Sequence, residues 1–116
     1  NAENITISNN LFTRIDGIGI SINGYNRNHS ILYNEGVWIG ESFITLWGDT
    51  ISDNTSVLDG FGYDGTTGIQ PRYINVSHNY VHELGIWQKQ SSFYFQAKSC
   101  LNNIENNIFY NNARAG

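Results

Sequence analysis

The sequence predicts an all-β fold, a right-handed parallel β-helix (a solenoid) of about four coils with one long insertion loop. A phrase that recurs along the chain is the main reason: an apolar residue, two spacers, an Asn and further apolar residues. The Asn of the phrase is Asn10, Asn34, Asn79 and Asn107. The steps between them are 24, 45 and 28 residues, and a period in the twenties is typical of a solenoid.

Composition is the second reason for an all-β prediction. The 116 residues suffice for one domain and include seventeen Asn, fifteen Ile, twelve Gly and one Pro. Asn is a poor helix former, and no stretch of the chain has apolar residues at helical spacing. Only 14% of the residues are charged, so Asn, Ser, Thr and Gly supply the polarity.

The first predicted coil spans about 4–24 and contains two segments of alternating apolar and polar residues. Ile5 and Ile7 flank a Thr, and residues 18–22 alternate in the same way, as half-buried strands do. Gly17 and Gly24 end these segments.

The second predicted coil spans about 28–48, and its strands are 30–33, 37–39 and 43–47. Ile44 stands at the same offset from its Asn as Ile20 does in the first coil. Strand alternation then directs Ile44 and Leu46 into the core, and it directs Phe43, Thr45 and Trp47 outward.

Residues of about 52–72 break the period and consist of turn-forming residues, so we expect an insertion loop there. Solenoids place such insertions on one face, often the binding face. The third coil then spans about 73–96 and the fourth about 100–116. Since neither end has a polar cap, we expect residues 1–116 to be a fragment of a single β-helix domain, with neighbouring coils of a longer parent chain as partners.

Successive coils of such a fold lie ~4.8 Å apart, with three strands expected per coil. The recurring Asn side chains would then stand above one another and form an internal amide ladder. The alternative is that Asn recurs because it tolerates left-handed backbone geometry at a bend.

The segment Asn4-Ile5-Thr6-Ile7-Ser8-Asn9-Asn10, with Asn107-Ile108-Phe109, resembles the right-handed β-helix repeat of the pectate-lyase-like superfamily. Residues 87–100, together with 113–116, resemble an uncharacterised subgroup of it. The resemblance implies the fold and a polysaccharide ligand in a groove along one outer sheet face. It does not imply one reaction, because the superfamily includes lyases, hydrolases, epimerases, phage spikes and adhesins.

Charge and motifs narrow the class of partner. The net charge of −4 disfavours nucleic acid, and no apolar run approaches the ~20 residues of a membrane span, so we expect no membrane insertion. Four Asn-X-Ser/Thr sequons favour an extracellular or secreted protein. Cys100 is the single cysteine, and beside Leu101 its thiol is expected to be buried.

We therefore expect an extracellular carbohydrate-binding or polysaccharide-processing β-helix, as a lyase or a glycoside hydrolase if it is an enzyme. Sugar sites combine aromatic platforms with polar groups. The expected substrate-binding residues are Trp47, Tyr63, Asp64, Arg72, His82 and Trp87. The alternative is a non-catalytic structural or adhesive solenoid in which these rings only pack.

The expected catalytic residues are Asp49, Glu83 and Lys89. A glycosidase needs two carboxylates and a lyase needs a base beside a cation. Ordinary turn and surface roles are the alternative for each residue. His82 and Glu83 are adjacent, so they can act together only if they lie in a bend. No cofactor is expected, because the spacing of the acidic residues does not support a calcium site.

One structural observation separates the two classes. Two carboxylates, or a carboxylate and a base, within reach on one outer face would favour an enzyme. A row of Asn, Ser and Thr side chains there would favour a structural protein.

Overall fold

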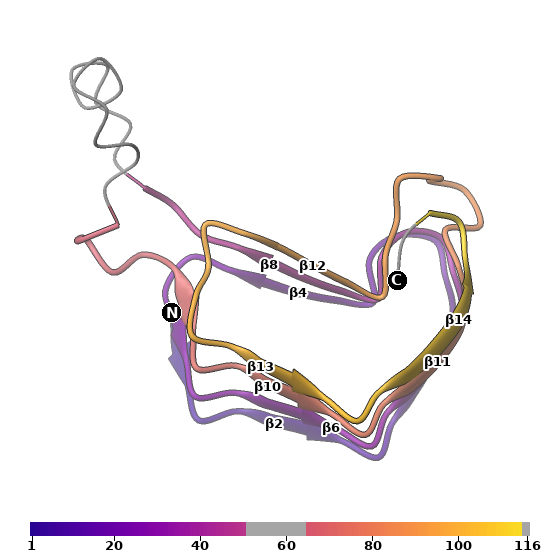
Figure 1. Cartoon of the computed structure of the whole chain (residues 1–116), viewed down its shortest axis with the longest axis horizontal. Helices are drawn as coiled ribbons and strands as arrows, with labels where there is room; N and C mark the ends of the chain where they lie inside the picture. Colours follow the sequence, from indigo (N-terminus) through magenta and orange to yellow (C-terminus); the bar gives the residue numbers. More distant parts are fainter. Residues whose placement is uncertain (51–64, 115–116) are drawn as a thin grey trace.

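The computed structural model describes residues 1–50 and 65–114, and every regular element in this part of the chain is a β-strand. All pairings between these strands are parallel, and they form four sheets. The chain winds so that each coil lies on the one before, as Figure 1 shows. The all-β prediction is confirmed, and the architecture is compatible with a β-helix or solenoid.

The first three coils contribute one strand to each sheet in turn, and the fourth contributes one strand each to sheets B and C. Sheet A consists of β1 (Ala2–Glu3), β5 (Asn26–Arg27) and β9 (Pro71–Arg72). Sheet B consists of β2 (Thr6–Ser8), β6 (Ser30–Leu32), β10 (Asn75–Ser77) and β13 (Asn103–Glu105). Sheet C consists of β3 (Leu11–Ile15), β7 (Glu35–Ile39), β11 (Tyr80–Leu84) and β14 (Ile108–Asn112). Sheet D consists of β4 (Ile20–Asn23), β8 (Ile44–Trp47) and β12 (Tyr94–Ala97).

The strand register follows the spacing of the repeated Asn. Ile7 pairs with Ile31, which is 24 residues later, and Ile31 pairs with Val76, which is 45 residues later. Sheet D departs from this, because Ile44 pairs with Tyr94 at a step of 50 residues. The connection from β11 to β12 is therefore longer than its counterparts in the first two coils, and the extra residues lie beside sheet D.

The coils have four strands where three were expected. Each short strand of sheet A is followed by a residue in the left-handed region: Asn4, Asn28 and Tyr73. Leu101 has the same conformation after the bridge residue Cys100, and the four φ angles lie between 55° and 59°. Asn9, Tyr33, His78 and Asn106 form a second left-handed corner between sheets B and C. A left-handed conformation costs a residue other than Gly about 1–3 kcal/mol, and Asn bears it best. Because Tyr, His and Leu also occupy these corners, sequence inspection does not reveal all the bends.

The recurring Asn side chains do form a ladder. Asn10 Nδ2 donates to Asn34 Oδ1 at 3.1 Å, Asn34 Nδ2 to Asn79 Oδ1 at 3.1 Å, and Asn79 Nδ2 to Asn107 Oδ1 at 2.9 Å. The backbone N–H groups of the first three also donate to the next Oδ1. Asn34 and Asn79 are 2% and 1% exposed, so the ladder satisfies backbone and side chain deep inside the coil.

A second interior column has the same geometry with different residues. The Ile5 N–H donates to His29 Nδ1 at 3.2 Å, and the Ile74 N–H donates to Asn102 Oδ1 at 3.0 Å. His29 Nε2 lies 3.1 Å from Asn26 Oδ1. Since Nδ1 accepts, the proton of the neutral ring is on Nε2. Burial lowers the pKa of His29 below its ordinary value.

Aromatic rings fill the core beside sheets C and D. Phe43 packs edge-on against Phe12 and stacks on Phe93, and Phe93 stacks on Phe109. The outward prediction for Phe43 is wrong: it is 0% exposed. It precedes β8 at the corner, where strand alternation no longer applies. A Cβ at Gly36 would approach the Phe43 ring to 2.7 Å, so this Gly makes room for it.

Among the other predictions of side-chain burial, three are confirmed and the one for Cys100 is wrong. Ile44 and Leu46 are buried and Trp47 is exposed, as predicted. Cys100 was expected to be buried, and it is exposed. It lies at the start of the fourth coil, where its backbone bridges to Arg72 of β9.

Candidate functional site

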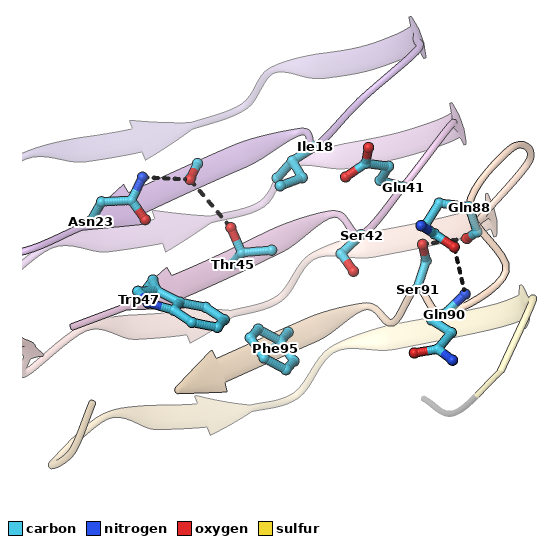
Figure 2. Close-up of a pocket in the computed structure, with 11 residues that line it drawn as sticks. Ile18, Asn23, Glu41, Ser42, Thr45, Trp47, Gln88, Gln90, Ser91 and Phe95 are labelled. Atoms are coloured by element: carbon cyan, nitrogen blue, oxygen red, sulfur yellow. Dashed lines mark hydrogen bonds between the residues drawn. The ribbon is translucent and has the colours of Figure 1, made fainter. Parts of the chain in front are cut away.

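The outer face of sheet D carries a groove of about 370 Å³, which is within the ~300–1,000 Å³ range of ligand sites. Its floor is the outer surface of β4, β8 and β12, and its wall is the long β11–β12 connection, as Figure 2 shows. The described residues that line it are Ile18, Ser21, Asn23, Glu41, Ser42, Thr45, Trp47, Gln88, Gln90, Ser91 and Phe95.

Strand register sets two parallel rows of side chains on this floor. Ser21, Thr45 and Phe95 are register partners in the first row. Trp47 belongs to the second row, where its partners are Asn23 and Ala97. The Trp47 ring stacks diagonally on Phe95, with 5.7 Å between ring centroids and 22° between the planes. Together the rings form a platform that remains 53% exposed at Trp47 and 42% exposed at Phe95.

Hydroxyl and amide groups surround this platform. Asn23 Nδ2 donates to Ser21 Oγ at 3.0 Å, and Thr45 Oγ1 donates to Ser21 Oγ at 3.3 Å (Figure 2). The backbone N–H of Ser92 donates to Ser42 Oγ at 3.1 Å, which ties the wall to the floor. Glu41 is the one carboxylate among the described lining residues, and no described side chain pairs with it.

Asp49, which was expected to serve catalysis, lies beyond the end of β8, and Arg72, which was expected to serve binding, belongs to β9 of sheet A. Asp49 Oδ1 accepts from the Thr50 N–H at 2.9 Å, which is ordinary turn chemistry. Arg72 Nη2 donates to the Gly65 carbonyl at 3.0 Å and to Gln70 Oε1 at 2.7 Å. Tyr63 and Asp64, expected as neighbours of this region, lie outside the described residues.

His82 and Glu83 lie on the outer face of sheet C. They satisfy the condition that two adjacent residues can act together only if they lie in a bend. Glu83 has a φ of 56°, so the chain bends there and both side chains point to one side. His82 Nδ1 is 4.0 Å from Glu83 Oε1. The His82 ring stacks on Tyr110 at 5.1 Å, and the hydroxyls of Tyr110 and Tyr80 are 2.6 Å apart. That hydrogen bond, with burial and the nearby Glu83, raises the pKa of Tyr110.

Trp87 and Lys89 lie on the wall but do not line the groove. Trp87 joins Arg14, Asp16 and Trp38 around a separate pocket of about 150 Å³. Lys89 Nζ donates to the carbonyl groups of Gly85 at 2.8 Å and Ile86 at 2.9 Å, so its ammonium faces the wall's own backbone.

The expected site residues thus belong to different places. Trp47 lines the sheet D groove, His82 and Glu83 share the sheet C face, and Trp87 has its own pocket. Asp49 and Glu83 are on different sides of the coil, where β8 ends and where β11 runs (Figure 1). Sequence inspection missed Phe95 and Gln88, because the longer connection before β12 hides their alignment with the second coil.

Two further properties concern the described residues. Within 1–50 and 65–114, no three His, Cys, Asp or Glu side chains are grouped so as to hold a metal ion. In the same ranges, no helix has the length and apolar character needed to span a membrane.

Comparisons with known proteins identified no relative of this chain. A scan against protein-family models, a search of curated proteins and a search of solved structures each found no match. Any function must therefore be argued from the groove and the sheet C cluster themselves.

Proposed function

We propose that this chain is a carbohydrate-binding part of a right-handed parallel β-helix of the pectate-lyase-like kind, and that the sheet D groove binds a glycan without cleaving it. The single observation that carries the proposal is the Trp47–Phe95 platform among hydroxyl and amide side chains. A sugar ring has an apolar face that stacks on aromatic rings and an equatorial rim of hydroxyls that exchange hydrogen bonds.

Binding without cleavage follows from the side chains that line the groove. Hydrolysis of a glycosidic bond uses two carboxylates, ~5–5.5 Å or ~6.5–9.5 Å apart, and the described lining contains Glu41 alone. Elimination beside a uronate needs a base and a neutralising cation, and the described lining contains no cation. Ser21 and Thr45 in the first row and Asn23 in the second are small polar side chains, and none of them is a carboxylate or a cation.

The proposed handedness and location rest on more general arguments. Connections between parallel strands of one sheet are right-handed in roughly 98% of cases, which favours a right-handed coil. A role in polysaccharide binding favours an extracellular location. Asn4 and Asn28, each in a sequon, are exposed at corners where a glycan could be attached.

A glycan-array experiment with three variants tests the proposal. Trp47→Ala and Phe95→Ala each remove half of the platform, so we expect about tenfold weaker binding or more. Trp38→Ala is the matched control, because Trp38 is 61% exposed but lies on sheet C. Circular dichroism checks that each variant folds. Glycan binding that survives both platform substitutions, or no binding by the parent chain, would contradict the proposal and favour a structural or adhesive solenoid.

A second candidate function is polysaccharide processing on sheet C, favoured by the His82–Glu83 contact beside two phenols. Imidazole, carboxylate and phenol are all groups that transfer protons in catalysis. Reducing-end release and absorbance of unsaturated products would measure hydrolysis and elimination on the same glycans. Under this candidate, His82→Gln abolishes turnover while Trp47→Ala chiefly weakens binding. No product from the parent chain would exclude it.

A further inference from the structure

We infer that the ligand of the sheet D groove is an uncharged glycan, a polymer of neutral hexoses or pentoses, and not a uronate. This inference rests on the proposed function of the groove. It departs from the acidic polysaccharide that a pectate-lyase-like resemblance would suggest, and the charges around the groove are the reason.

Among the described residues, the groove lining holds no cation to receive a carboxylate. None of its described lining residues is Lys, Arg or His, and Glu41 contributes a negative charge. The segment 51–64, whose structure is not described, contains no Lys, Arg or His in its sequence either. That segment therefore brings no positive charge to any part of the molecule.

Two cations outside the lining, Lys89 and Arg27, make contacts within the protein. Gln88 and Gln90 line the groove, but Lys89 between them turns its ammonium to the Gly85 and Ile86 carbonyls. Arg27 donates to the Gly68 carbonyl at 2.7 Å and lies 4.3 Å from the centre of the Tyr25 ring. Moving any of these groups to a ligand would break hydrogen bonds within the protein.

A uronate placed here would lose water around its carboxylate without gaining a counter-charge, and it would also meet Glu41. A neutral sugar carries no such penalty. Its hydroxyls both donate and accept, as do the hydroxyls of Ser21 and Thr45 and the amides of Asn23, Gln88 and Gln90. The lining therefore matches a ligand whose polar groups are hydroxyls.

The test compares neutral and uronate oligosaccharides of equal length by calorimetry, at low and at physiological salt. We expect the best neutral oligosaccharide to bind at least about tenfold more tightly than any uronate, with little salt dependence. A uronate that binds more tightly than every neutral sugar would overturn this inference and leave the proposed glycan-binding function standing. Binding of neither class would overturn both.

Glu41→Gln tests the role of charge directly. This substitution removes the negative charge at nearly constant shape, so the ratio of uronate affinity to neutral affinity should rise about two- to fivefold. Glu105→Gln on sheet B is the matched control, because Glu105 is exposed and does not line the groove. Equal ratios for the parent and Glu41→Gln would overturn the role assigned to Glu41.

Discussion

The Asn ladder inside the coil and the outer face of sheet D share one strand register, but they place different kinds of side chain in it. Inside, Asn10, Asn34, Asn79 and Asn107 repeat one side chain at one position, and each amide bonds to the next. Outside, the stacked positions of sheet D hold different residues: Ser21 is followed by Thr45 and then Phe95. The column of identical Asn side chains is a structural element, whereas the different residues in register on the face of sheet D make a surface that can recognise a ligand.

This difference has a chemical basis. A primary amide both donates and accepts, so a column of them is self-complementary and leaves no polar group without a partner. An aromatic ring beside hydroxyls is not self-complementary in this way, so its exposed face is available to a ligand. Substitutions inside should therefore affect folding, and substitutions outside should affect binding.

The largest expected effect is on the ladder. Asn79→Asp replaces an amide that donates to Ile31 O with a buried carboxylate, which would also face Asn107 Oδ1. We expect a loss of about 3–5 kcal/mol in the free energy of unfolding, measured by urea denaturation. Asn103→Asp makes the same charge change at an exposed position and should cost less than about 1 kcal/mol. Equal losses would mean that the ladder is not a special element.

Two neighbours on β8 give the next largest contrast. Leu46 is 0% exposed, and Leu46→Ala should cost about 2–5 kcal/mol. Trp47 is 53% exposed, so Trp47→Ala should cost only about 0.5–1.5 kcal/mol, mainly from lost stacking on Phe95. Thermal and urea unfolding measure both. A larger loss for Trp47→Ala than for Leu46→Ala would show that the platform is packing for the fold.

A smaller effect concerns pH and the second interior column. The pKa of His29 is lowered by burial, so the unfolded chain binds a proton more readily than the folded one as pH falls through 6.5. The stabilising contribution is fully present above this pH and decreases below it. We expect His29→Gln to flatten the fall in unfolding free energy between about pH 7 and pH 5. A parent chain equally stable across this range would contradict the assignment.

The smallest effect tests the sheet C face. The hydrogen bond to Tyr80 is the main cause of the raised pKa of Tyr110. Tyr80→Phe should therefore lower the pKa of Tyr110 toward 10.0, with Tyr33→Phe as the control. Titration followed by NMR of the ring carbons measures this, and stability should not change. An unaltered Tyr110 titration would mean that the two phenols do not interact.

Predictions from the sequence were correct where a structural role requires one particular type of residue. The Asn ladder and the pairing of Ile20 with Ile44 were predictable, because an amide column and a strand alternation leave a direct trace in the sequence. The exposure of Trp47 followed from the same alternation.

Such predictions failed where the backbone bends without Gly. Phe43 is at a corner before β8, so the alternation of β8 does not extend to it, and Glu83 occupies a left-handed bend inside β11, where alternation also stops. Phe95 went unnoticed because the β11–β12 connection shifts the step to 50 residues in sheet D. Which way Lys89 turns depends on two carbonyl groups of its own loop, and no sequence pattern records that.

The longer β11–β12 connection has a practical consequence for protein engineering. The strands on either side of it are held in place by pairing with β7 and β8, so this corner accommodates a change of length without a change of strand pairing. Libraries that vary residues 86–92 would graft new specificities onto an unaltered scaffold, much as antibody loops vary on a constant framework.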